Sequence, residues 1–408
     1  MKIDNVLFDH SDNLKRYLKF PAIYPLVNAL LSYKYRDDEV TKISYQYALE
    51  LVRRTYGRDG KAVMVNIFTP TEFLYALDLY PMLPEVVSGF LSALDLVGRP
   101  LQESEELVSS SDLCSVHKCI IGLSKLNFLP NPDLLISVNK PCHSAIYSFY
   151  LLNQMYGGSY YPLDSYERVD FLAGKLEKIY NELSMKLRIQ DADLKLKKAI
   201  DLSNEAREYL LEINELRKEA LVIGGKEFLD YAGMIFSAFG SKYGVVFFKA
   251  LRDKIKDLIK KGKIIEPKIR LYWMHLGPYF RTDFFDWMKS KGAYIVFEES
   301  SFITWEKLDP NNPFESLAKK MLNLKAFSTL EERYDVAVKN VEEYKADGVV
   351  IFNQWGCRQG SVPSYFLRKK LVNGGIPAIV IDGDLIDKTN FPKEQIKTRM
   401  EAFFEVIA

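Results

Sequence analysis

The segment Gly348–Gly360, which reads GVVIFNQWGCRQG, joins a buried-strand pattern to a cysteine-bearing loop. Its first five residues form an apolar, largely β-branched run, which predicts a strand buried on both faces of a parallel sheet. Cys357 follows just past the predicted strand, with glycines nearby on each side that free the loop backbone. In open α/β sheets, ligands bind outside the carboxyl ends of the strands. The segment therefore predicts both a class of fold and one edge of a site.

Similar apolar runs flank this segment, at residues 269–275, 293–297 and 376–381, and they alternate with helical patterns. They predict a second α/β domain over residues 266–408 that ends in a C-terminal helix. Upstream, residues 62–68, 134–138 and 160–163 also read as strands, and Thr69-Pro70 is expected to cap a helix over residues 71–79. These elements predict a first α/β domain over residues 61–165.

The remaining segments carry helical patterns. Residues 1–60 repeat apolar side chains at helical spacing, and residues 166–265 are rich in charged side chains at three- and four-residue spacing, as over 168–187 and 193–218. The predicted architecture is therefore an α/β fold with two Rossmann-like parallel-sheet domains, an N-terminal helical cap and a helical insertion.

Composition narrows the class of protein. The 408 residues carry a formal charge of +1 and are 48 % hydrophobic, so we expect no nucleic-acid partner. Met1–Lys19 lacks the apolar centre of a secretory signal, and no run is long enough to span a membrane. Four cysteines without such a signal indicate a reducing compartment, so we expect a cytoplasmic protein with free or metal-bound thiols.

The positions of three cysteines suggest chemistry. Cys142 and Cys357 each follow a predicted strand, and Cys114 follows a polar turn where a helix should begin. A helix N-terminus favours the thiolate, and thiolates suit iron–sulfur clusters or zinc. Scattered cysteines are also commonly plain core residues, so spacing alone leaves that interpretation open. The zinc alternative would use Cys114, His117 and Cys119 with Cys142 or His143.

Several of these motifs resemble those of the 2-hydroxyacyl-CoA dehydratase and benzoyl-CoA reductase family. The resemblance is carried by residues 345–350, 353–358, 375–384 and 395–407 in the C-terminal part, and by residues 112–115 and 132–142 upstream. It implies that Cys114, Cys142 and Cys357 hold a [4Fe–4S] cluster, with one iron free of a protein ligand. Cys119 would then be a spare, buried thiol.

The resemblance also implies partners. The family works as a heterodimer of related cluster-binding subunits, acts on an acyl-CoA, and receives its electron from a separate ATP-hydrolysing iron–sulfur activator. The chain has no G-x-x-x-x-G-K-[ST] loop, in agreement with ATP hydrolysis elsewhere.

Residues 65–73 and Pro84-Glu85 resemble the substrate-side motif of the family, which makes Glu85 a candidate catalytic carboxylate; a solvated first-turn glutamate explains it as well. Ile67 stands where catalytic-side dehydratase subunits tend to have a serine, which favours the electron-relaying, beta-type subunit. Trp355 and Arg358 flank Cys357 and are candidates to tune the cluster, although core filling and a surface ion pair are the simpler roles.

The function predicted is that of a cluster-binding subunit of a 2-hydroxyacyl-CoA dehydratase that removes water by a one-electron, ketyl-radical mechanism. ATP-dependent reduction of an aromatic acyl-CoA is the nearest alternative. A reductase with a double-cubane cluster ranks third, because the six thiolates expected exceed the four cysteines present. The non-enzyme alternative is a zinc-stabilised scaffold subunit.

Overall fold

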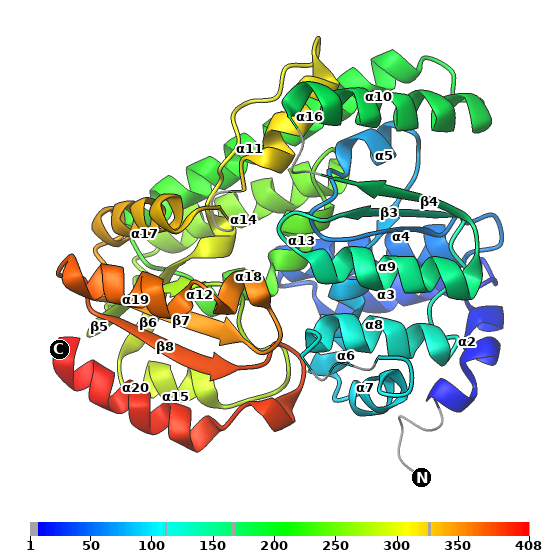
Figure 1. The fold of residues 1–408 in the computed structure, drawn as a ribbon. Helices are drawn as coiled ribbons and strands as arrows, with labels where there is room; N and C mark the ends of the chain where they lie inside the picture. Colours follow the sequence, from blue (N-terminus) through cyan, green and yellow to red (C-terminus); the bar gives the residue numbers. More distant parts are fainter. Residues whose placement is uncertain (1–6, 109, 111, 165–167, 325–327, 408) are drawn as a thin grey trace.

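Two four-stranded parallel sheets organise the chain (Figure 1). The computed structural model describes residues 7–108, 110, 112–164, 168–324 and 328–407. The predicted boundary between residues 165 and 166 lies outside the described residues. The strands are β1 Val63–Val65, β2 Pro81–Met82, β3 Leu134–Val138, β4 Ser159–Leu163, β5 Ile269–Met274, β6 Ala293–Glu298, β7 Gly348–Gln354 and β8 Ala378–Gly383.

The first sheet has the order β2-β1-β3-β4, and the second has the order β6-β5-β7-β8. Every neighbouring pair is parallel, as between Val350 of β7 and Ile379 of β8. β3 and β7 are almost wholly buried, in agreement with their continuous apolar runs. The predicted α/β class with two parallel sheets is confirmed.

The N-terminal and middle parts of the chain are helical, as predicted. The N-terminal helices are α2 Ser11–Tyr17, α3 Ile23–Lys34 and α4 Glu39–Tyr56. The middle helices are α10 Val169–Lys186, α11 Ala192–Glu219, α12 Gly225–Asp230, α13 Ala232–Ser237 and α14 Lys242–Lys260. α11 packs along α14 and also reaches α5 beside the first sheet.

The other helices lie around the two sheets. Those between β1 and β4 are α5 Glu72–Ala76, α6 Pro84–Ala93, α7 Gly98–Ser104, α8 Ser115–Lys125 and α9 His143–Tyr156. Those after β5 are α15 Phe284–Ser290, η1 Glu299–Ser301, α16 Pro313–Leu322, α17 Leu330–Glu343, α18 Arg358–Ser361, α19 Ser364–Asn373, η3 Lys388–Asn390 and α20 Lys393–Ile407. α16 follows β6 in the chain but packs against α10, and its Leu317 joins the apolar core beneath the first sheet.

The sheets face each other by their carboxyl ends. In Figure 1 the arrowheads of β4 and β8 point toward the space between the two sheets. Loops and helix N-termini that follow strands of both sheets therefore meet in the centre of the molecule.

Two local expectations need correction. β2 was not predicted, because a two-residue strand is too short to show a periodic pattern. Thr69 does not cap α5, which begins three residues later with Thr71 at its N-cap. Instead, the Thr69 hydroxyl donates to Asn66 Oδ1 at 2.9 Å and helps to fix the turn after β1.

Candidate functional site

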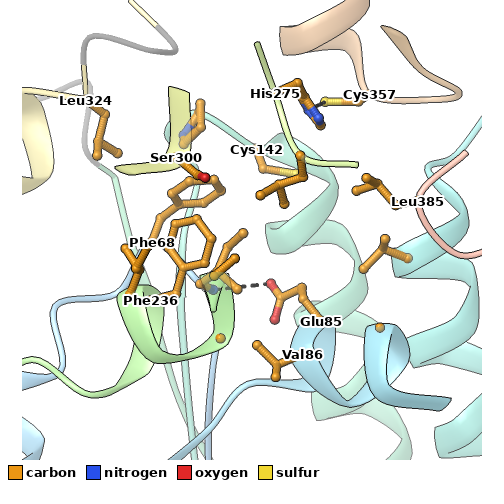
Figure 2. Close-up of a pocket in the computed structure, with 18 of the residues that line it drawn as sticks. Phe68, Glu85, Val86, Cys142, Phe236, His275, Ser300, Leu324, Cys357 and Leu385 are labelled. Carbon is orange, nitrogen blue, oxygen red and sulfur yellow. Dashed lines mark hydrogen bonds between the residues drawn. The ribbon is translucent and has the colours of Figure 1, made fainter. Parts of the chain in front are cut away.

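A cavity of about 450 Å³ lies where loops from both sheets converge. Its wall includes the turn after β1, the start of α6, α13, η1 and the loops after β3, β5 and β7. Figure 2 shows Glu85, Cys142, Cys357 and Ser300 around this space. Its position at the carboxyl ends of parallel strands is the one expected for a ligand site in an α/β fold.

Three of the four cysteines line this cavity. Cys114, Cys142 and Cys357 occupy the N-cap positions of α8, α9 and α18. The expectations that Cys114 stands where a helix begins, and that Cys142 and Cys357 follow strands, are confirmed. Their shared cavity brings together residues from both halves of the chain.

Burial keeps these thiols protonated. Burial is the main reason why the pKa of Cys142 rises to about 12, and negative charge on Cys357 would raise it further. The pKa of Cys114 is raised well above its usual value by burial and by the neighbouring Cys357 and Cys142. Burial raises the pKa of Cys357 too, against the opposing effect of the Gly360 and Gln359 amides. A bound cation or metal cluster is thus needed to make the three thiolates stable together.

Two histidines and one glutamine contact the cysteines. His117 Nε2 lies 3.3 Å from Cys142 Sγ, and His275 Nε2 lies 3.6 Å from Cys357 Sγ. Burial lowers the pKa of each histidine to about 4, so both rings are neutral at pH 7. Gln354 Nε2 is 3.8 Å from Cys114 Sγ. Each sulfur atom therefore has one neutral polar group close to it.

The halves of the site are joined by hydrogen bonds around Gln354. Its side-chain nitrogen donates to Ser115 Oγ at 3.2 Å, while its Oε1 accepts from the Leu385 amide at 2.5 Å. Ser115 Oγ in turn donates to the buried Asp384 at 2.6 Å. The first residue of α8 is thus tied to the ends of β7 and β8.

Two glycines allow the cysteine loops to approach. Gly356 has a φ of +73°, and a Cβ there would lie 2.7 Å from both Cα and N of Cys114. A Cβ on Gly360 would lie 2.9 Å from the His275 ring and 3.4 Å from Cys357 Sγ. Only glycine fits both the left-handed conformation and the close contact at position 356.

Glu85, in the first turn of α6, turns its carboxylate toward the same cavity (Figure 2). The Ile67 amide donates to its Oε1 at 3.4 Å, while its buried Oε2 has no hydrogen-bond partner within the described chain. Burial raises the pKa of Glu85 to about 8, against the opposing effect of the backbone amides. The buried Oε2 differs from the solvated carboxylate of the alternative interpretation, while the residue as a whole is half-buried. Glu85 can instead exchange a proton near neutral pH.

The positions of the thiols and histidines bear on the two metal alternatives. Within the residues that the structure describes, no three His, Cys, Asp or Glu side chains are close enough to hold one metal ion. The zinc alternative thus finds no formed site there. Cys119, which it required, is fully buried inside α8 and does not line the cavity. A cluster binds its cysteines through separate iron atoms, so its ligands need not meet at a single point.

Some of the other residues that sequence analysis singled out line the cavity and some do not. Trp355 is 56 % exposed, so it does not fill the core, and Arg358 is exposed beside Cys357 at the start of α18. Neither lines the cavity, whereas Ile67 and Thr69 do. Sequence analysis did not select His275 as a site residue. The residue directly follows β5, and this position at the carboxyl end of a strand could have indicated it. Sequence analysis also missed Ser300, for which the sequence carries no signal.

No helix in the described ranges is both long enough and apolar enough for a membrane crossing.

Comparison with known proteins finds a family and several relatives. The family "2-hydroxyglutaryl-CoA dehydratase, D-component" matches residues 66–407. A benzoyl-CoA reductase subunit of Thauera aromatica is 25 % identical, with 91 % of this chain and 95 % of the relative covered. The (R)-phenyllactyl-CoA dehydratase alpha subunit of Clostridium sporogenes is 22 % identical, with 83 % and 87 % covered. The (R)-2-hydroxyisocaproyl-CoA dehydratase alpha subunit of Clostridioides difficile is 21 % identical, with 90 % and 94 % covered.

Proposed function

Because the chain belongs to the 2-hydroxyglutaryl-CoA dehydratase D-component family, we propose that it is a [4Fe–4S]-binding subunit of a 2-hydroxyacyl-CoA dehydratase. Cys114, Cys142 and Cys357 would hold the cluster. The observation that carries this proposal is the presence of these three thiols, from both halves of the chain, on one cavity. When bound, the cluster would supply single-electron chemistry to a thioester carbonyl, which is the origin of the ketyl-radical route.

Residues of this chain would transfer protons and exclude water from the cavity. Glu85 is held by the Ile67 amide on the wall of the cavity, where its raised pKa lets it hold a proton at neutral pH or take one from a substrate carbon. The apolar side chains around it exclude water, which protects a reactive substrate from side reactions.

We further propose that this chain binds the acyl group itself. Ile67 had favoured the electron-relaying subunit, but its side chain and Glu85 line one cavity with the cysteines. The Clostridium sporogenes and Clostridioides difficile relatives are alpha subunits of dehydratases. A related cluster-bearing subunit, forming a heterodimer, and an ATP-hydrolysing iron–sulfur activator would complete the working enzyme.

Reduction of an aromatic acyl-CoA is the second candidate. It is favoured by the similarity to the benzoyl-CoA reductase subunit, which extends over nearly the full length of both chains. The two reactions differ in product: a dehydratase releases water and returns the electron, whereas a reductase leaves a partly reduced ring.

Metal analysis tests the cluster. We expect anaerobically purified protein to contain about four iron atoms and about four acid-labile sulfides per chain. Cys357→Ser should strip the cluster, while Cys119→Ser, the matched control in a buried thiol off the cavity, should retain it. One zinc per chain, or equal loss in the two variants, contradicts the assignment.

Product analysis tests the reaction. The purified complex is mixed with activator, ATP, a reductant and either a 2-hydroxyacyl-CoA or benzoyl-CoA. Formation of an enoyl-CoA supports dehydration, and formation of a ring-reduced thioester supports the second candidate. Consumption of neither thioester contradicts both.

A further inference from the structure

We propose that the cavity selects an uncharged, apolar acyl group and rejects one that carries a free carboxylate, because the one lysine or arginine among the described residues of its wall, Lys320, is neutralised within the protein by Glu72. The inference rests on the proposed function, since it takes the cavity to be the acyl site of this chain. It narrows the substrate to monocarboxylic acyl thioesters with an aromatic or bulky aliphatic side chain.

The side of the cavity away from Cys357 is apolar and aromatic. Figure 2 places Phe68, Phe236 and Leu324 on that side, across the space from Cys357. The Phe68 and Phe236 rings meet edge to face, with centroids 6.2 Å apart. Such a wall offers favourable contacts to a phenyl ring or a branched alkyl chain.

Lys320 is the only lysine or arginine among the described residues that line the cavity. Its Nζ lies 2.6 Å from Glu72 Oε1, and Glu72 is fully buried. Ser203 Oγ donates to the same oxygen at 2.7 Å. The ammonium also lies over the rings of Phe239 and Trp305, 4.9 and 4.8 Å from their centroids. The positive charge is therefore already balanced before any ligand enters.

The acidic groups of the described wall also leave no cation free to pair with a carboxylate on the ligand. Glu299 is paired with the buried Arg333 through two hydrogen bonds of 2.9 Å, and Asp230 is paired with Lys226. Glu85 completes the set, and backbone amides of the described chain, rather than a cation, stabilise its charged form. A dicarboxylic acyl group would thus bury a charge for which the described wall offers no counter-ion, which is costly in an apolar cavity.

Binding measurements test the selectivity. The chain of 408 residues, purified anaerobically with its bound cluster, is titrated in a calorimeter with 3-phenylpropionyl-CoA and with glutaryl-CoA. We expect the phenyl thioester to bind more tightly by a factor on the order of 10². Similar affinities for the two thioesters overturn the inference and leave the proposed function intact. Binding of neither thioester contradicts the proposed function itself.

Variants test the role of the ion pair. Glu72→Gln keeps the shape of the side chain but frees the charge of Lys320, so we expect glutaryl-CoA to bind at least about tenfold more tightly than to the unaltered protein. The double variant Glu72→Gln/Lys320→Met should lose that gain. If Glu72→Gln does not fold, Phe236→Arg introduces an unpaired cation on the same apolar side and should give the same gain. No gain in a folded variant overturns the inference.

Discussion

Replacing Gly356 with alanine tests whether the close approach of the two cysteine loops forms the site. The left-handed φ of +73° costs an alanine about 1–2 kcal/mol. The added Cβ would also lie 2.7 Å from Cα and N of Cys114, where ordinary contacts begin at 3.4 Å. Because both atoms are backbone, the loops must separate by several tenths of an ångström, and overpacking of this kind costs about 1–3 kcal/mol. We therefore expect Gly356→Ala to lower the free energy of unfolding by about 2–5 kcal/mol.

Gly375→Ala is the matched control. Gly375 has a φ of +83°, but a Cβ there meets no atom within 4 Å. It should lose only the conformational term of about 1–2 kcal/mol. Urea unfolding of the two variants isolates the contact with Cys114, and iron analysis of the same samples reports its effect on the cluster. We expect Gly356→Ala to lose most of its iron and Gly375→Ala to keep it. Equal unfolding midpoints and equal iron contents would refute the reasoning.

Three further outcomes are expected. The pKa of Glu85 in the folded protein is about 8, above its usual value of 4.5. Between these pH values the folded state holds a proton that the unfolded chain has lost. The free energy of unfolding therefore falls as the pH rises from about 4.5 to 8. In urea titrations, Glu85→Gln should reduce the difference in unfolding free energy between pH 5 and pH 8 by on the order of 2–4 kcal/mol. The variant should also abolish turnover. An unchanged pH dependence of stability would count against a buried carboxyl group at Glu85. Arg333→Met leaves Glu299 buried without its partner and should lower the unfolding free energy by about 3–5 kcal/mol, whereas the double variant Arg333→Met/Glu299→Gln should recover part of that loss in the same titration. After removal of iron by a chelator, Cys142 should react slowly with iodoacetamide at pH 8, because its pKa of about 12 keeps the thiol protonated; alkylation as fast as that of free cysteine, followed by peptide mass spectrometry, would contradict this.

The sequence predicted the elements that continuous patterns encode. The apolar runs over residues 134–138 and 348–352 became β3 and β7, and the cysteines after them fell at helix N-caps. Boundaries moved by up to three residues, as at β1, where the strand predicted over residues 62–68 ends at Val65. These features follow from local side-chain periodicity, which sequence records directly.

Pairings across the fold were beyond sequence analysis. Glu72 and Lys320 are 248 residues apart, and neither lies in a motif that indicates a partner. The burial of Glu85 depends on how α6 packs beneath the turn at Ile67, which no local pattern specifies. His275 was missed as a contact of Cys357 because the two residues come from different elements, whereas His117 had been placed with Cys142 only in the zinc alternative.

The close contact between Gly356 and Cys114 also bears on when the site can be assembled during protein synthesis. If Cys114, Cys142 and Cys357 hold a cluster, as we propose, the set of ligands is incomplete while only the first sheet has been synthesised, since Cys357 follows β7 of the second sheet. On that proposal, iron and sulfide would be delivered after β7 has been made, and Cys114 and Cys142 would have to stay reduced until then.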